Sequence, residues 1–198
     1  MDLEHIRQGQ QKDLAGTRLE DLDLSQVQWS GVNLAGATLK GSQLIQADLE
    51  GACLEGTNLV GCQLHQAKLQ VNAWGANFLR ADLTQVDARG GNFRGANLMG
   101  AEASQAWFAG AFLNGSNVVG GNFAGADLRG ADLRDADLQG ANFAEANLEE
   151  ADLRGANCCG TNLTRANLLC ADVENTTCGG ATLTGACLRG TAWDLDPA

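Results

Sequence analysis

Side chains that carry out acid–base or nucleophilic chemistry are scarce in this sequence. Its 198 residues include only two histidines, His5 and His65, which lie far apart along the chain. The seven cysteines are odd in number and lack the short paired spacings of zinc sites. We therefore expect reduced thiols that fill small apolar positions, and no Cys–His or Ser–His nucleophile pair.

Carboxylates are abundant but spread regularly. Asp132, Asp152 and Asp172 recur at one interval, and Arg134 and Arg154 each follow an aspartate by two residues. Stacked carboxylates repel, so we expect the arginines to offset them, and a cation site needs converging oxygens rather than a line. The sequence therefore predicts no catalytic residue, no metal site and no cofactor, and the protein is not expected to be an enzyme.

The charge balance limits the partners. With 24 acidic and 13 basic residues the formal net charge is −11, whereas direct nucleic-acid binding needs a basic footprint. The opening residues MDLEHIRQGQ contain no apolar segment typical of a secretion signal. No run approaches the roughly 18 apolar residues of a membrane span, so we expect a cytoplasmic protein without membrane contact.

A five-residue repeat must position all of these side chains. From Leu14 to Leu69, and again from Phe78 to Trp193, a residue that is most often Leu or Phe returns at every fifth position, here called the centre. The residue two before the centre is usually Ala, and the residue two after it is usually Gly. A fixed short period predicts a solenoid whose units bury their apolar sides by stacking. The centre and the small residue should point inward, and the Gly should form a corner with positive φ.

The stretch ADLRGADLRDADLQGANFAEANLEEADLRGAN, residues 126–157, resembles the pentapeptide repeat family, including near-consensus members abundant in cyanobacteria. The resemblance covers about residues 12–195. It implies an all-β solenoid, namely a right-handed quadrilateral β-helix with four units per coil and about nine coils. A short helical cap is expected in residues 1–11 and a tail at residues 196–198.

Both ends of such a solenoid need cover, because they would otherwise expose the core and the strand edges. We expect Leu3 and Ile6 of the N-terminal helix to face the first coil. At the other end, Trp193 occupies a centre position and is expected to close the rod.

The repeat is broken once. The spacing between Leu69 and Phe78 is nine residues instead of ten, which predicts a unit one residue short at residues 72–75. One interpretation is a bulge that the stack absorbs, with Trp74 filling the corner. The other is a hinge or a recognition point.

Residues 103–126 contain no Asp, Glu, Lys or Arg, and we call them the uncharged belt. Trp107 and Phe112 lie in this belt at the position before the centre, which usually holds Asp or Asn. Contiguous exposed apolar residues indicate an interface, although the aromatics could instead lie flat on small neighbours. An aliphatic stripe should run into the belt, formed by outward residues one coil apart: Leu79, Met99 and Val119.

Two functions fit these features. The first is a non-catalytic structural or interaction protein that binds a protein partner, or a second copy of itself, through the belt and the stripe. The second follows from the family resemblance, because quinolone-resistance members imitate DNA and bind DNA gyrase, a type II topoisomerase. Arginines that interrupt the acidic faces after residue 75 weaken this alternative.

Overall fold

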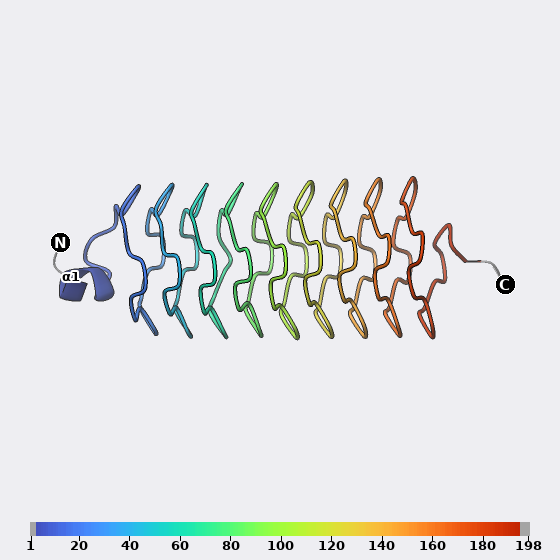
Figure 1. Cartoon of the computed structure of the whole chain (residues 1–198), viewed down its shortest axis with the longest axis horizontal. Coiled ribbons are helices and arrows are strands. Elements are labelled where there is room, and N and C mark those ends of the chain that lie inside the picture. Colours follow the sequence, from blue (N-terminus) through green and yellow to red (C-terminus); the bar gives the residue numbers. More distant parts are fainter. Residues whose placement is uncertain (1–2, 195–198) are drawn as a thin grey trace.

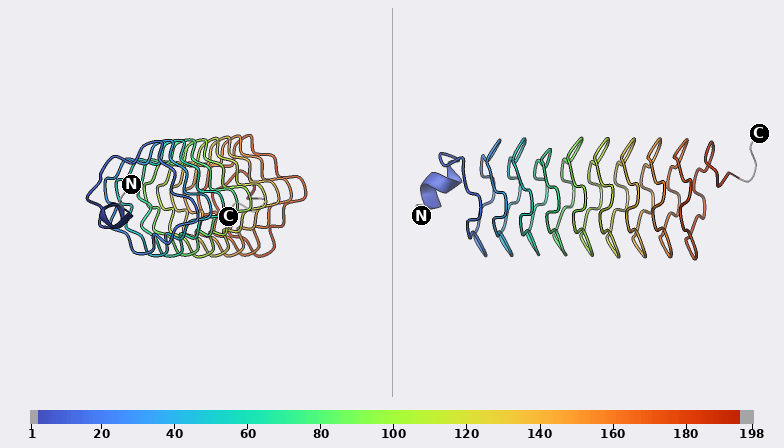
Figure 2. Two further views of the ribbon diagram at one scale, coloured as in Figure 1. Left: turned by 60° about the vertical axis from the view of Figure 1, so that its left-hand side comes forward. Right: turned by 90° about the horizontal axis from the view of Figure 1, so that it is seen from above.

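The computed structural model describes residues 3–194, which form a rod of stacked coils with the two ends of the chain at opposite ends (Figure 1). Helix α1 (Leu3–Arg7) lies at the N-terminal end. Two further views show the coils following one another without any layer packed on their outer faces (Figure 2). The side chain of Leu3 and the tail at residues 196–198 lie outside the described part of the chain.

Parallel bridges between successive coils hold the rod together. Bridged residues are 20 apart over most of the chain, as for Asn33 with Cys53 and Asp132 with Asp152, so one coil contains four units of five residues. Backbone hydrogen bonds accompany each bridge; the N–H of Leu34, for example, donates to the carbonyl of Cys53 at 2.7 Å. Among the described residues, each unit up to that of Leu188 contributes a single bridge residue and no longer strand.

The corners explain the glycine positions. Every glycine two residues after a centre has a positive φ, as at Gly36 with 65°, a conformation that glycine adopts without steric cost. Thirteen described residues other than glycine also have a positive φ, among them Gln46 with 57°. The predicted corner is confirmed, and the polypeptide imposes it even where a side chain is present.

The interior is filled by the centres and by the small residues two before them. Leu and Phe centres from Leu14 to Leu168 are between 0 and 3% exposed. Five phenylalanines touch in sequence, with ring centroids 5.2–5.8 Å apart; the first four come from four different faces, and the fifth lies one coil after the fourth on the same face. They form a continuous aromatic core through the middle of the rod: Phe78, Phe93, Phe108, Phe123 and Phe143.

The two ends differ. Ile6 of α1 is fully buried, and its carbonyl accepts a hydrogen bond of 2.7 Å from Nε1 of the buried Trp29. At the other end Trp193 is only partly buried, although it packs against the core, and Leu183 and Leu188 are likewise only partly buried. The centres of the last coil are therefore less covered than those of the first.

The break lies a few residues earlier than the sequence predicted. Lys68 and Asn72 are successive bridge residues only four apart, and bridges that span this point join residues 19 apart, such as Lys68 with Asp87. The missing residue belongs to the corner between Gln70 and Val71, and residues 71–75 form a complete unit. Trp74 does not fill a corner, because it points outward and is 55% exposed.

Candidate interaction surface

The described residues contain no group of three or more His, Cys, Asp or Glu side chains placed to hold a metal ion. Two thiols, Cys62 and Cys158, occupy interior positions, and burial raises the pKa of each to about 12. These two thiols stay protonated near neutral pH and are poor nucleophiles. Nor is any helix in residues 3–194 long and apolar enough to cross a membrane.

The predicted carboxylate ladder is organised by arginines. Arg134 donates from Nε and Nη2 to the two carboxylate oxygens of Asp132, and Arg154 binds Asp152 in the same way. Each of these arginines also reaches the next coil, since Nε of Arg134 lies 3.5 Å from a carboxylate oxygen of Asp152. Hydrogen bonding to the guanidinium groups holds the pKa of Asp132 and of Asp152 below the ordinary value.

Trp107 interrupts a similar pattern on a neighbouring face. It bridges to Asp87 in the preceding coil and to Asp127 in the following coil, so that an indole stands between two aspartates. The ring is 48% exposed. Beside it, Arg89, Arg129 and Asp127 line a hollow of about 270 Å³ with Trp107.

Phe112 belongs to the next ladder, between Asn92 and Asp132. It is 38% exposed, and the guanidinium carbon of Arg94 lies 4.3 Å from the ring centroid. This contact is a cation–π interaction, and Nε of Arg94 also donates to Oδ1 of Asn114 at 3.0 Å. Trp107 and Phe112 therefore lie on adjacent faces of one coil, and each has an arginine beside it.

The aliphatic stripe is in register but less exposed than the aromatics. The residue after each member donates its N–H to the carbonyl of the member in the next coil. Gly100, which follows Met99, donates to Val119, and Gly61, which follows Val60, donates to Leu79. Met99 is exposed, whereas Leu79 and Val119 are half-buried. The same column begins one coil earlier with the half-buried Val60, which the sequence reasoning missed although its spacing fits.

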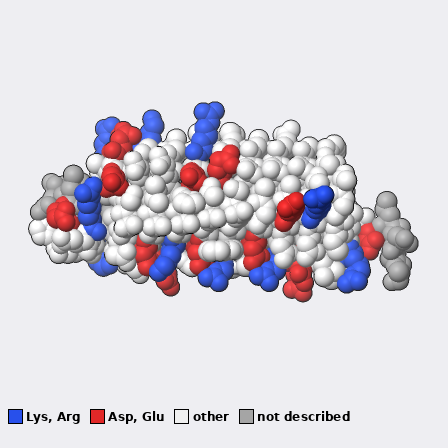
Figure 3. Space-filling model, turned by 90° about the horizontal axis from the view of Figure 1, so that it is seen from below, with Lys and Arg blue, Asp and Glu red and all other residues white. Residues whose placement is uncertain are grey.

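Charged groups leave much of the surface uncovered. Figure 3 shows one side of the rod, where acidic and basic side chains lie next to each other in pairs with uncharged surface between them. Pairing explains this distribution, because Asp87, Asp127, Asp132 and Asp152 each bind an arginine two residues later. The net charge thus overstates how strongly acidic these faces are.

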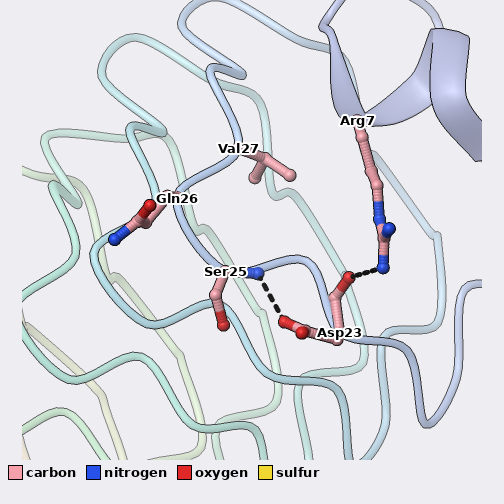
Figure 4. A pocket seen from close by; sticks show the side chains of 5 residues that line it. All are labelled: Arg7, Asp23, Ser25, Gln26 and Val27. Carbon is pink, nitrogen blue, oxygen red and sulfur yellow. Dashed lines mark hydrogen bonds between the residues drawn. The ribbon is translucent and has the colours of Figure 1, made fainter.

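A second hollow lies between α1 and the first coil. Its volume is about 450 Å³, and Arg7, Asp23, Ser25, Gln26 and Val27 line it (Figure 4). Figure 4 shows Arg7 extending from α1 so that its Nη2 donates to the carbonyl of Asp23, at 2.6 Å. Through this hydrogen bond Arg7 attaches the helix to the solenoid. The hollow is therefore part of the junction between α1 and the first coil.

One corner carries a ladder of glutamines that the sequence reasoning did not identify. The side-chain amide of each donates to the next at 2.8–3.1 Å, and the ladder continues across the short corner. The signal was present, since glutamine replaces the corner glycine in five successive coils: Gln26, Gln46, Gln66, Gln85 and Gln105. Such ladders add hydrogen bonds between stacked coils.

The short corner also leaves one polar atom without a partner. Oε1 of Gln70 is buried and accepts no hydrogen bond within the described residues. Just across the corner, a Cβ on Gly91 would lie 3.0 Å from the carbonyl oxygen of Leu69. The same Cβ would lie 2.6 Å from Cε2 of Phe93, so only glycine fits at residue 91 without adjustment.

Comparison with known proteins finds a family with the same five-residue repeat. A family model described as pentapeptide repeats matches in 8 copies, over residues 13–51, 42–70, 76–115, 108–143 and 141–177. No curated protein is similar enough to count as a relative.

Solved structures with the same repeat are also similar. Full-length QnrB1, a plasmid-mediated fluoroquinolone resistance protein, is 22% identical, with 86% of this chain and 90% of that chain covered and a TM-score of 0.59. HetL of the cyanobacterium Nostoc sp. strain PCC 7120, involved in heterocyst differentiation regulation, is 24% identical, with 96% and 94% covered and a TM-score of 0.35. Rfr23 of the cyanobacterium Cyanothece 51142 is 18% identical, with 98% and 97% covered and a TM-score of 0.26.

Proposed function

Because the chain belongs to the pentapeptide repeat family, we propose that it is a non-catalytic interaction protein that binds a protein partner, or a second copy of itself, through the uncharged belt and the aliphatic stripe. The proposal places it in the cytoplasm. The scaffold it requires is the right-handed quadrilateral β-helix of about nine coils, with α1 as the cap of the first coil.

The observation that carries this proposal is the exposure of Trp107 and Phe112. Both stand at the position before the centre, where neighbouring coils have Asp or Asn. The bridges on either side keep the same register, so the fold itself does not require an aromatic residue at either place. Trp and Arg are the residue types enriched where binding energy concentrates, and each of these two aromatics has an arginine beside it.

The experiment replaces both aromatics. The Trp107→Ser/Phe112→Ser variant should lose self-association in sedimentation velocity, or should no longer retain a protein that the unmodified chain captures. Ile45→Ser is the matched control, because Ile45 is a half-buried outward residue outside the belt and the stripe. If the double variant associates and captures proteins as the unmodified chain does, the belt is not the interface.

A second candidate function is imitation of DNA toward gyrase. It is supported by the net charge of −11 and by a fold shared with QnrB1, at a TM-score of 0.59. The arginines paired with Asp87, Asp127, Asp132 and Asp152 count against it, because they neutralise the carboxylates that would stand for phosphates. A gyrase supercoiling assay with a quinolone decides the question: absence of protection at micromolar protein would exclude this function.

A further inference from the structure

The hollow beside Trp107 arises from one omission in a regular pattern. Arg89, Ala109 and Arg129 occupy the same column, because the N–H groups of Gly90 and Gly110 donate to the carbonyls of Ala109 and Arg129, respectively. In the coils before and after, an Asp–Arg pair covers this face. In the coil of Trp107 the arginine is replaced by alanine, so a space opens between two guanidinium groups.

The hollow is accessible from the corner of the rod. The corner glycines of these three coils, Gly90, Gly110 and Gly130, have no atom within 4 Å of the place where a Cβ would lie, so no side chain covers the corner next to this column. The exposed indole of Trp107 forms one wall, and the two arginines form the sides. A planar group entering here can stack on the indole, or on a guanidinium, without displacing any side chain.

The unused donors belong to the arginines. Arg89 gives Nε and Nη2 to Asp87, and Arg129 gives Nε and Nη2 to Asp127. Among the described residues neither Nη1 has a hydrogen-bond partner. Asp127, in contrast, already accepts three hydrogen bonds, since it also accepts the backbone N–H of Arg129 at 3.2 Å. The hollow therefore offers donors to a ligand and has little acceptor capacity left for a cation.

The spacing suits a small anion. Arg89 and Arg129 lie two coils apart in one column, so their backbones are roughly 10 Å from each other when coils are about 4.8 Å apart. Both guanidinium groups line the hollow, so a carboxylate between them can accept a charge-assisted hydrogen bond of about 2.8 Å from Nη1 of either arginine. A dianionic phosphate fits less well, because Asp87 and Asp127 lie close by and would repel its second charge.

We propose that this hollow binds a carboxylate carried next to a planar apolar group, as an acidic residue beside an aromatic residue in the docked segment of a partner protein would present it. The inference rests on the proposed function, since it names the chemistry of the partner. The planar group lies on Trp107 while the carboxylate bridges the two arginines.

The test uses benzoate as the minimal probe and the full chain labelled with 5-fluorotryptophan. The chain has four tryptophans, which should give separate fluorine signals, and Trp107→Phe assigns the relevant one. Benzoate should shift the Trp107 signal saturably at millimolar concentrations, while the signals of the exposed Trp74 and the buried Trp29 stay in place. Benzamide, which has the same shape without the charge, should cause no saturable shift.

Two variants locate the site. Arg89→Gln with Arg129→Gln should weaken benzoate binding about tenfold, as expected for the loss of charge-assisted hydrogen bonds. Ala109→Leu should abolish it by filling the hollow while retaining both charges. Arg154→Gln is the matched control, because Arg154 forms the same kind of pair with Asp152 on another face, and it should bind benzoate like the unmodified chain.

The results separate this proposal from the broader one. No saturable shift up to 20 mM benzoate (about the weakest binding expected of so small a ligand), an equal shift with benzamide, or tighter binding of phenyl phosphate would each overturn the carboxylate assignment. If benzoate binds but Trp107→Ser/Phe112→Ser leaves association intact, the proposed function fails instead. If that double variant loses association while benzoate never binds, the interface stands and only this subsite is wrong.

Discussion

Two adjoining stretches of the rod have the same backbone arrangement but different outward side chains. In residues 127–154, Asp127, Asp132 and Asp152 each stand before a centre, and each is paired with an arginine after it. In the uncharged belt the same two positions hold Trp107 with Ala109 and Phe112 with Asn114. The bridges keep the same 20-residue interval in both stretches. The inward positions and the corners therefore specify the coil, and the outward positions are left for function.

The largest expected effect separates inward from outward aromatics inside the belt. Phe108→Ala should lower the free energy of unfolding by about 3–5 kcal/mol, because it removes a fully buried ring from the aromatic core and leaves a cavity. Phe112→Ala should cost less than about 1 kcal/mol, as is usual for surface positions. Chemical denaturation measures both. Equal losses of unfolding free energy would show that the two side chains do not point to opposite sides of the coil.

A smaller effect compares two buried serines at the same position of the repeat. Ser42 donates to the carbonyl of Leu19 at 2.6 Å and accepts from the N–H of Leu22, whereas Oγ of Ser116 in the belt has no partner among the described residues. Ser42→Ala should therefore cost about 1–2 kcal/mol, and Ser116→Ala should be neutral or stabilising. Thermal unfolding of the two variants checks this, and a destabilised Ser116→Ala would contradict the assigned bonding.

The paired stretch should respond weakly to loss of one partner. Arg134→Ala should cost about 0.2–1 kcal/mol, the range measured for exposed ion pairs. The hydrogen bonds of Asp132 and Asp152 to arginine lower their folded pKa values. Their contribution is thus present above the unfolded pKa of about 3.9 and is lost as pH falls through the folded value.

The pH dependence of stability tests the same ion pairs in a second way. Between pH 5 and 2, the unmodified chain should lose more stability than the Arg134→Ala/Arg154→Ala variant, in which the two carboxyl groups titrate closer to about 3.9. Denaturation at a series of pH values measures the difference. Parallel curves for the two proteins would mean that the ion pairs contribute nothing to folding.

The smallest expected effect on stability is produced by making the belt resemble its neighbour. Trp107→Asp with Ala109→Arg recreates the pair found one coil before and one coil after. Its free energy of unfolding should stay within about 0.5 kcal/mol of the unmodified chain, as is usual for surface substitutions. Thermal unfolding measures it, and a loss several times larger would mean that Trp107 supports the coil itself.

Much of this molecule follows from the five-residue period. The period, with its centre, the small residue two before it and the glycine two after it, predicted which residues are buried and where positive φ occurs. Stacking explains this, because it requires the same residue types at these three positions in every coil. They also placed Trp107 and Phe112 on adjacent faces. What the period does not specify is how outward side chains pair, so the hollow between Arg89 and Arg129 emerged only with the coils in register. The glutamine ladder is visible in the sequence, because glutamine returns at the corner position of five successive coils.

The break was misplaced for a definite reason. Counting large apolar centres passes over Ala73, a small centre that is fully buried, so the missing residue was assigned to its own unit. The bridges show that residues 71–75 are complete and that the corner before Val71 is short. A small side chain at a centre is thus enough to shift the apparent position of a deletion.

The central claim is that the outward positions of the belt form an interface that the fold does not need. It is tested most directly by Trp107→Asp/Ala109→Arg combined with Phe112→Asp/Asn114→Arg, compared with the unmodified chain by sedimentation velocity and partner capture. The account predicts a folded rod of unchanged stability that no longer self-associates or retains its partner. A folded variant that associates and captures as before would contradict it.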